Sequence, residues 1–433
     1  MDRTLRVLVA GAAGLVLLLA ACSSGGRATP PASGSPGGNK LEVVSWWTSG
    51  SERAALDVIF DNFTKSDPGV DIVNAAVVGG GGSNAQVVLA NRLASNDPPD
   101  VWQTHPGGSL RAYYNAGLLA DVSSVYQQDN LSSAVPKQMR AGVSVGGKEY
   151  GVSTGAHRVN VLWFNKKLLA RAGVSPPVGD YTIEAFLTDL RRVHAAGIVP
   201  LCRGGKDPFA TSELFENTLL SVVGAKGWTA LAADDFRWDG AQVDQALNSF
   251  GTMLGYSDPE AAALTWDRAT KKLAAGGCAF EGVNDSAYGE LVKTGAKEGT
   301  DFGYVAFPGT DDAFLTVVDT FVIAANVRDR ASAVTFLATI GGKETQLAFN
   351  KVKGSTPIRV DVDVSSLPPY QQAAAKAFRN GNVLLSITHG EATSPDFQRT
   401  FYDAVAAYAD SKDAAAFHSA LRDSDGQVQP FGH

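Results

Sequence analysis

The segment 41–63 joins a short apolar strand directly to an amphipathic helix, and this junction limits the possible folds more than any other feature of the chain. Val43 and Val44 are β-branched and are typical of the end of a buried strand. Ser49 and Ser51 can cap the helix that follows. The apolar stripe of that helix has the spacing i, i+3, i+4, i+7 and consists of Leu56, Ile59, Phe60 and Phe63. Strand and helix patterns go on alternating along the chain, and this order predicts an α/β fold.

Two adjacent tryptophans, Trp46 and Trp47, lie between this strand and this helix. In an open α/β sheet, ligands bind just beyond the carboxyl ends of the strands. The position therefore predicts that both indole rings contact a ligand, with Glu52 beside them in the first turn of the helix. The alternative is that one Trp packs in the core while the other covers the surface, as most aromatic side chains do.

A further strand end carries the polar side chains of Gln103 and His105, directly after the apolar residues Val101 and Trp102. By the same rule we expect both polar residues near the ligand, although a lone His is more often a structural hydrogen-bond partner.

The run Gly79–Gly82 precedes another predicted helix and is not a phosphate-binding loop, because no Gly-Lys-Ser/Thr follows it. It predicts a tight turn whose N–H groups can approach a ligand oxygen.

These features resemble those of a known family. Ser45-Trp46-Trp47, ahead of a helix that ends in Asp67-Pro-Gly-Val-Asp71, resembles the start of bacterial family 1 extracellular solute-binding proteins, the sugar receptors of ABC importers. The resemblance is closest to the branch that binds glucose and mannose, and it extends from about Lys40 to beyond Phe397. It implies an α/β fold of the periplasmic-binding-protein-like type II class, in which two lobes are joined by a three-segment hinge and the ligand cleft lies between them.

The lobe boundaries follow from segments that resemble the crossovers of this family. These segments are Gly146–Ser153 just before the first crossover, Asp301–Gly309 at the second and Lys353–Arg359 at the third. A chain of 433 residues is also too long for one ordinary core. We therefore expect lobe 1 to comprise residues 40–153 and 310–353, and lobe 2 to comprise residues 154–309 and 354–433.

The resemblance also implies a sugar site whose members divide by their chemistry. Aromatic planes cover the C–H faces of a sugar, and the candidates are Trp46, Trp47 and Trp266. Acidic, basic, amide and imidazole groups satisfy the hydroxyls, and the candidates are Glu52, Gln103, His105, Asp285, Asp319, Lys353 and His389. His157 is a further candidate for the cleft. Asn284-Asp285-Ser286 stands where the related branch has Gly-Asp-Trp, so the missing aromatic leaves the identity of the sugar open.

Residues 1–21 are predicted to form a lipoprotein signal peptide. Its apolar run, Val7–Ala20, is short for a membrane span. Leu19-Ala-Ala-Cys22 has the form of a lipobox, so Cys22 is the expected lipidation site, and residues 22–39 have the composition of a flexible linker. The alternative is ordinary secretion with cleavage nearby. We expect a monomer that a lipid anchor holds at the extracytoplasmic face of the cell membrane, where a closed receptor would dock on the transmembrane subunits of an ABC permease.

Cys202 and Cys278 are the cysteines that remain after Cys22. The predicted compartment is oxidising, so these two residues are candidates for a disulfide. Two buried free thiols are the alternative, and only geometry decides between them.

The composition excludes some classes of function and leaves others open. The formal net charge is −7, and no basic stripe is present, so nucleic acid is not an expected partner. We find no metal or cofactor motif and neither a Gly-x-Ser-x-Gly nor a His-Glu-x-x-His signature. We therefore expect a binding protein rather than an enzyme.

Two rival functions stay open. One is a secreted glycosidase, whose catalysis needs two carboxylates at a set separation. Glu52, Asp285 and Asp319 could be the catalytic carboxylates of such an enzyme. The other is the same scaffold with an oligosaccharide or another polar solute as its ligand.

Overall fold

The computed structural model describes residues 39–78, 83–232 and 236–424. The predicted signal peptide, the lipidation site Cys22, the predicted linker except Asn39, and the run Gly79–Gly82 lie outside these residues. Asn39, expected at the end of the linker, opens the first strand. Within the described ranges, no helix combines the length and the apolarity that a membrane span requires.

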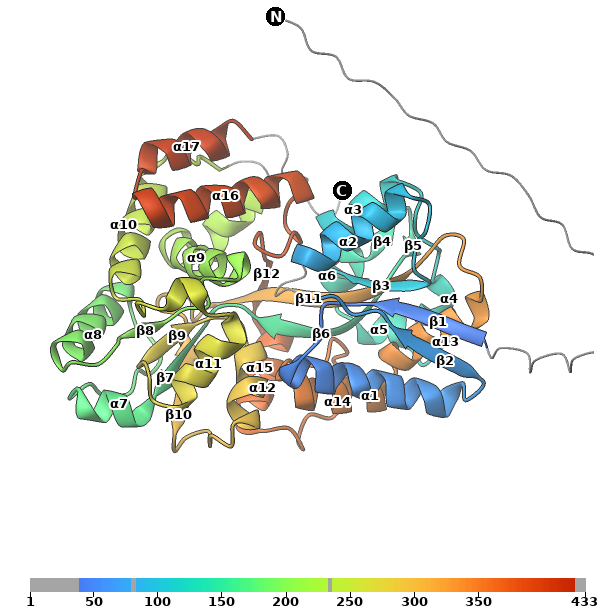
Figure 1. The fold of residues 1–433 in the computed structure, drawn as a ribbon, viewed down its shortest axis with the longest axis horizontal. Helices are drawn as coiled ribbons and strands as arrows, with labels where there is room; N and C mark the ends of the chain where they lie inside the picture. Colours follow the sequence, from blue (N-terminus) through green and yellow to red (C-terminus); the bar gives the residue numbers. More distant parts are fainter. Residues whose placement is uncertain (1–38, 79–82, 233–235, 425–433) are drawn as a thin grey trace, which may run out of the picture. The chain divides into compact units, whose positions relative to one another are not determined.

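The larger of the two main sheets is built around β11, an 11-residue strand that is buried along its whole length. The strand order is β12-β11-β3-β1-β2, and β6 also pairs with β11 (Figure 1). The strands β1, β2 and β3 are parallel, whereas β11 runs antiparallel to β3 and to β6. The strands of this sheet are β1 (Asn39–Val44), β2 (Val70–Asn74), β3 (Val101–Thr104), β6 (Val152–Arg158), β11 (Ala313–Ile323) and β12 (Asn382–Leu385).

The smaller sheet has the strand order β10-β7-β9-β8. Its central strand β7 runs antiparallel to both neighbours, β10 and β9. The chain passes from the larger to the smaller sheet between β6 and β7, and it returns between β10 and β11. The strands of this sheet are β7 (Val161–Asn165), β8 (Leu201–Cys202), β9 (Phe280–Gly282) and β10 (Phe302–Ala306), and a separate hairpin consists of β4 (Ser144–Val145) and β5 (Lys148–Glu149).

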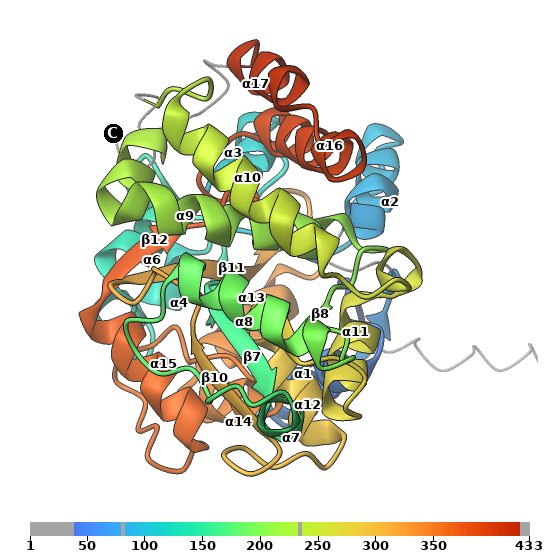
Figure 2. The ribbon, with the colours of Figure 1, turned by 90° about the vertical axis from the view of Figure 1, so that its left-hand side faces the viewer.

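Helices cover both sides of the larger sheet. On one side α1 packs against α13 and α14, and α2 and α3 lie on the other side (Figure 1). Near the smaller sheet, α10 packs against both α8 and α9 (Figure 2). The longer helices are α1 (Gly50–Ser66), α2 (Ser83–Ala94), α3 (Gly108–Asn115), α8 (Ile183–Ala195), α9 (Pro208–Ala232), α10 (Ala241–Gly255), α11 (Trp266–Ala274), α12 (Ser286–Lys293), α13 (Arg330–Gly341), α14 (Lys343–Lys353), α15 (Pro369–Asn380), α16 (Pro395–Ser411) and α17 (Ala414–Arg422).

The predicted stripe of α1 faces the core. Leu56, Ile59 and Phe63 are fully buried, and Phe60 is half-buried against them. A buried side chain of this size stabilises the fold by about 1.5–3 kcal/mol, so this face fixes α1 on the sheet. As a result, the N-terminal turn of α1 has a defined place, after the five residues that follow the end of β1.

The chain returns beside β6 after α14. Thr356 forms an isolated bridge with Ala156 of β6, and β12 then pairs in parallel with the beginning of β11. The two sheets and the passages between them are the elements of the expected two-lobe α/β architecture. The lobe boundaries at residues 153, 309 and 353 stay a prediction.

Cys202 and Cys278 are joined by a disulfide, with their Cα atoms 5.6 Å apart. Cys202 ends β8, and Cys278 lies two residues before β9, its parallel neighbour. Both residues are fully buried. Of the two alternatives that the sequence leaves open, the structure contains the bridge.

Candidate functional site

A buried cavity lies where the carboxyl ends of several strands meet the first turns of several helices. The free space enclosed by its side chains is about 30 Å³, and space that is open to solvent brings the total to about 360 Å³. The lining residues are Trp46, Glu52, His105, His157, Phe209, Trp266, Asn284, Ser286, Val317, Asp319, Lys353 and His389. All of them are buried except Glu52, whose side chain is 16% exposed. A ligand at this site would contact mainly buried side chains.

The positions of the lining residues follow from the α/β order. His105 comes directly after β3, and Trp46 and Asn284 lie two residues beyond the ends of β1 and β9. Residues in the first turns of α1, α9, α11 and α12 also reach the cavity, namely Glu52, Phe209, Trp266 and Ser286. The N-terminal ends of four helices, which carry the positive ends of the helix dipoles, therefore meet around this region.

The aromatic side chains of the lining lie close to the imidazoles. The ring of Trp46 is 5.2 Å from that of His105, and the ring of Phe209 is 5.8 Å from that of His389. The two imidazole rings are 5.3 Å apart in an edge-to-face arrangement. Apolar planes therefore lie directly beside hydrogen-bonding groups, which suits a ligand with C–H faces and polar edges.

Lys353 connects two helices at the cavity. Its Nζ donates to Glu52 Oε1 at 3.0 Å and to Ser286 Oγ at 2.8 Å. Burial raises the pKa of the Glu52 carboxyl above its ordinary value, and the nearby ammonium of Lys353 opposes this rise. The ammonium carries three N–H donors, so one of them is available for a ligand in the cavity.

A second group of charges surrounds His157. Its Nδ1 lies 2.5 Å from Asp285 Oδ1, and its Nε2 lies 3.6 Å from Asp319 Oδ2. Burial and the charge of Lys353 disfavour the imidazolium, but the two carboxylates outweigh them, so the pKa of His157 lies above its ordinary value. Burial alone would raise the pKa of Asp319, yet the hydrogen bond from His157 and the charge of Lys353 hold it well below its usual range. The arrangement keeps Asp319 ionised as a hydrogen-bond acceptor.

Two imidazoles of the lining each keep one nitrogen without a protein partner. The Nδ1–H of His105 donates to the carbonyl oxygen of Val318 at 3.0 Å, and the Nε2–H of His389 donates to Glu213 Oε1 at 2.7 Å. The other nitrogens, His105 Nε2 and His389 Nδ1, are buried and have no partner among the described residues. A buried polar atom without a partner costs free energy, so a ligand that bonds these two nitrogens would remove that cost.

His105 is expected to stay neutral throughout the physiological pH range. Burial, together with the nearby His389, lowers its pKa from 6.5 to about 4. Between pH 6.5 and pH 4 this imidazole binds a proton in the unfolded chain but not in the folded one. The free energy of unfolding therefore decreases as the pH falls through this range. An NMR titration of the imidazole, assigned by comparison with a His105→Gln variant, should show no change in its chemical shifts above about pH 5. A midpoint near 6.5 would contradict this expectation.

Three of the predicted ligand contacts lie behind the lining. Trp47 is fully buried and packs against Phe321 and Phe349, with ring centroids 5.7 and 5.3 Å away. Gln103 accepts from the backbone N–H of Trp46 at 3.2 Å and donates to Asp319 Oδ1 at 2.7 Å. Gln103 therefore holds two lining residues, Trp46 and Asp319, in place, and neither Trp47 nor Gln103 lines the cavity.

Asp285 is the third of these residues. It is fully buried, and its Oδ2 accepts from the N–H of Arg158 and from the hydroxyl of Tyr370, both at 3.0 Å. Its Oδ1 bonds to His157, so every oxygen already has a protein partner. The neighbouring Ser286 lines the cavity instead.

Five residues around the cavity were not predicted from the sequence as ligand contacts: Phe209, Glu213, Asn284, Ser286 and Val317. Val317 had a usable signal, because it shares a strand face with Asp319 two residues later. Glu213 lies behind the lining and accepts from His389 and from both the backbone and the side-chain N–H groups of Asn284. It is 176 residues from His389 in the sequence, so no local pattern joins the two.

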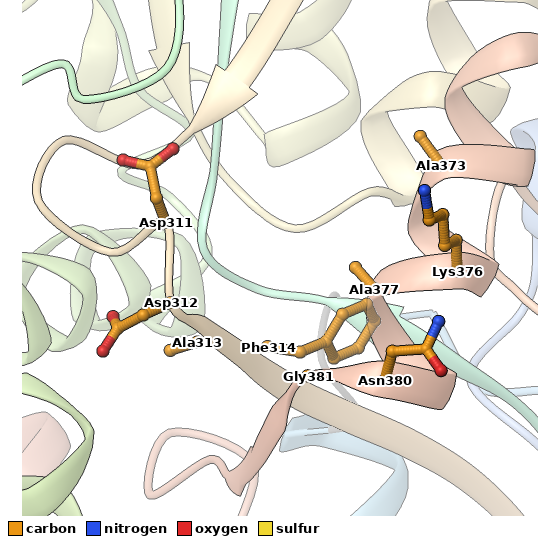
Figure 3. Close-up of a pocket in the computed structure, with 9 residues that line it drawn as sticks. All are labelled: Asp311, Asp312, Ala313, Phe314, Ala373, Lys376, Ala377, Asn380 and Gly381. Carbon is orange, nitrogen blue, oxygen red and sulfur yellow. The ribbon is translucent and has the colours of Figure 1, made fainter.

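A larger and more open hollow lies between the start of β11 and α15. Figure 3 shows Asp311 and Lys376 on its two sides, with Phe314 and Ala377 between them. None of the residues that were predicted to bind a ligand lines it. Nowhere among the described residues do three or more His, Cys, Asp or Glu side chains form a group that could hold a metal ion.

The two sheets, with their strand ends meeting at this cavity, have the fold of the periplasmic-binding-protein type II class. A solved structure of the bacterial solute receptor AcbH, described as having an exclusive preference for β-D-galactopyranose, superposes with a TM-score of 0.77 at 17% identity. The superposition covers 90% of this chain and 99% of that one. It confirms the fold class that the sequence predicts.

The chain belongs to the family of bacterial extracellular solute-binding proteins, whose model matches residues 47–347. An uncharacterized ABC transporter extracellular-binding protein of Pyrococcus horikoshii is 30% identical over 86% of this chain and 84% of its own length. A probable sugar-binding periplasmic protein of Mesorhizobium japonicum is 28% identical over 90% of this chain and 91% of its own. The family consists of receptors, so the expectation of a binding protein rather than an enzyme is confirmed, and the glycosidase rival is set aside.

Proposed function

We propose that this protein is the lipid-anchored, extracytoplasmic receptor of an ABC importer and that it binds a monosaccharide of the glucose or mannose type. One observation carries the proposal: the buried cavity places aromatic planes beside polar groups, two of which lack a protein partner. The description of the Mesorhizobium relative as sugar-binding supports the same ligand class.

The polar groups of the cavity match the chemistry of a neutral sugar. His105 is neutral and its Nδ1 carries the proton, so Nε2 can only accept, which requires a hydroxyl donor on the ligand. Lys353 supplies a donor for a hydroxyl or ring oxygen, and the carboxylates of Glu52 and Asp319 can each accept from hydroxyls. Trp46, Phe209 and Trp266 then cover the C–H faces.

The small free space in the cavity bears on how a ligand enters. It is about 30 Å³, the share of a single water molecule in the liquid. The lobes must therefore separate to admit a sugar and close again around it, which is the hinge motion of two-lobe receptors. We propose that the closed form docks on the permease and that Cys22 carries the lipid anchor.

An oligosaccharide is the second candidate ligand, and a separate observation favours it. A wider pocket of about 280 Å³ adjoins the cavity and shares Trp46, Glu52 and Trp266 with it. Its other lining residues are mainly polar and include Thr48, Ser49, Lys206, Asp207, Thr265 and Asp267. A second sugar unit linked to the first could extend into this space.

Titration calorimetry distinguishes the two candidates. The chain from Gly38 onward forms one compact unit and would be titrated with glucose, mannose, galactose, xylose, maltose and cellobiose. We expect one monosaccharide to bind with a dissociation constant near 1 μM, about −8 kcal/mol. Binding of a disaccharide alone would favour the second candidate. No heat with any of the six would contradict the proposed ligand class and leave the receptor fold unaffected.

A further inference from the structure

Helix α1, which carries Glu52 into the cavity, begins without a cap from its own sequence. Ser49 occupies the N-cap position but makes no side-chain hydrogen bond to the helix. The first N–H groups of a helix have no intrahelical acceptor and need one from elsewhere. The start of α1 therefore depends on a neighbouring element.

The acceptor comes from α12, a helix that follows a strand of the other sheet. Glu290 Oε1 accepts from the backbone N–H of Ser51 at 2.5 Å, and Glu290 is fully buried. Lys271 Nζ lies 3.4 Å from the other carboxylate oxygen and partly balances its charge. Gly50 has a φ of +65°, and a Cβ at this residue would lie 2.1 Å from Glu290 Oε1, so glycine makes this approach possible.

The same two helices meet a second time, at the cavity itself. Ser286, one turn before Glu290 on α12, accepts from Lys353, which also donates to Glu52 on α1. Residues four apart lie on the same face of a helix, so Ser286 and Glu290 both face the first turn of α1. Between them, Gly289 allows close packing, because a Cβ there would lie 2.7 Å from the carbonyl oxygen of Lys353.

We propose that Glu290 is a positioning residue for the ligand site. Its carboxylate holds the backbone at Ser51 and thereby sets the place of the next residue, Glu52, whose carboxylate must reach both Lys353 and the ligand. The negative charge also lies at the positive end of the α1 dipole, where it is favourable. The inference rests on the proposed function, because it takes the cavity as the sugar site.

Two substitutions of Glu290 test the proposal by titration calorimetry with the sugar that the wild type binds. Glu290→Ala removes the acceptor and is expected to weaken binding about tenfold, since small displacements of a positioned group cost binding strongly. Glu290→Gln keeps a carbonyl oxygen for Ser51 and is expected to restore most of the affinity. Asp413→Ala is the matched control, because Asp413 caps α17 through the N–H of Ala416 at 3.0 Å but is not part of the cavity. It should leave the affinity unchanged.

A double-mutant cycle separates positioning from a general loss of stability. If Glu290 acts through Glu52, then Glu290→Ala should have little further effect on affinity in a Glu52→Ala background. An additive loss in the double variant would overturn the proposal, as would unchanged affinity in Glu290→Ala.

Hydrogen exchange gives a readout that needs no ligand. The Ser51 amide should exchange faster in Glu290→Ala than in the wild type, because it loses its acceptor. Equal exchange rates would overturn the proposal. If the wild type binds none of the sugars, the proposed function fails, whereas the exchange measurement still decides whether Glu290 holds this turn.

Discussion

Replacing Lys353 with methionine is expected to weaken sugar binding at least 100-fold while the unliganded protein keeps its fold. Lys353 is fully buried and donates to Glu52 and to Ser286 at the cavity. A hydrogen bond to a charged group contributes about 1.5–3 kcal/mol. The variant loses both the donor to the ligand and the positive charge that opposes the rise in the pKa of Glu52. A loss of about 2.7 kcal/mol already corresponds to a factor of 100. Methionine keeps most of the length and apolar contact of the lysine stem, including its place near the ring of Trp47.

The measurement is titration calorimetry, with circular dichroism as the check of folding. Lys351→Met is the matched control, because Lys351 lies on the same last turn of α14 but is exposed and does not line the cavity. It should bind as the wild type does. An affinity of Lys353→Met within tenfold of the wild type would show that the ammonium is not a ligand contact.

Replacing Arg359 with methionine is expected to lower the free energy of unfolding by about 3 kcal/mol without a direct effect on the cavity. The guanidinium is fully buried and donates to Asp129, to Asp361 and to the carbonyl oxygen of Gly341. Breaking a buried ion pair costs about 3–5 kcal/mol when the partner charge stays buried. Asp129 and Asp361 are 58% and 34% exposed, so water can solvate them after the substitution, and we expect the lower end of this range.

Urea unfolding at neutral pH measures this effect. Arg399→Met is the control, because Arg399 pairs with Asp396 on the exposed side of α16, where both side chains are about 70% exposed. Such a surface pair contributes less than about 1 kcal/mol. Equal midpoints for the two variants would show that the buried Arg359 contacts do not stabilise the fold.

The sequence predicted the elements and one part of the site for a local reason. Burial on one side imposes a period on each element, so the stripe of Leu56, Ile59 and Phe63 was visible without the structure. The rule that ligands bind beyond strand ends placed Trp46 and His105 at the cavity, because β1 and β3 are parallel neighbours whose carboxyl ends meet at one edge. The family resemblance added residues from distant segments, such as Lys353 and His389.

The tertiary structure decided which member of an adjacent pair faces the ligand. Trp46 lines the cavity, whereas Trp47 packs in the core against Phe321 and Phe349. Ser286, the first residue of α12, reaches the cavity, whereas Asp285, at the N-cap of the same helix, bonds to the wall behind it. Composition and spacing do not distinguish such neighbours.

By itself, the sequence determined the α/β class, the apolar faces of the helices and the set of strand ends from which a ligand site could be built, since each depends on residues a few positions apart. Only the tertiary structure decided the pairings across the chain, such as Glu290 with Ser51 and Glu213 with His389. These contacts join residues 239 and 176 positions apart. They form because the packing of two sheets and their helices brings buried carboxylates to N–H groups that would otherwise lack an acceptor.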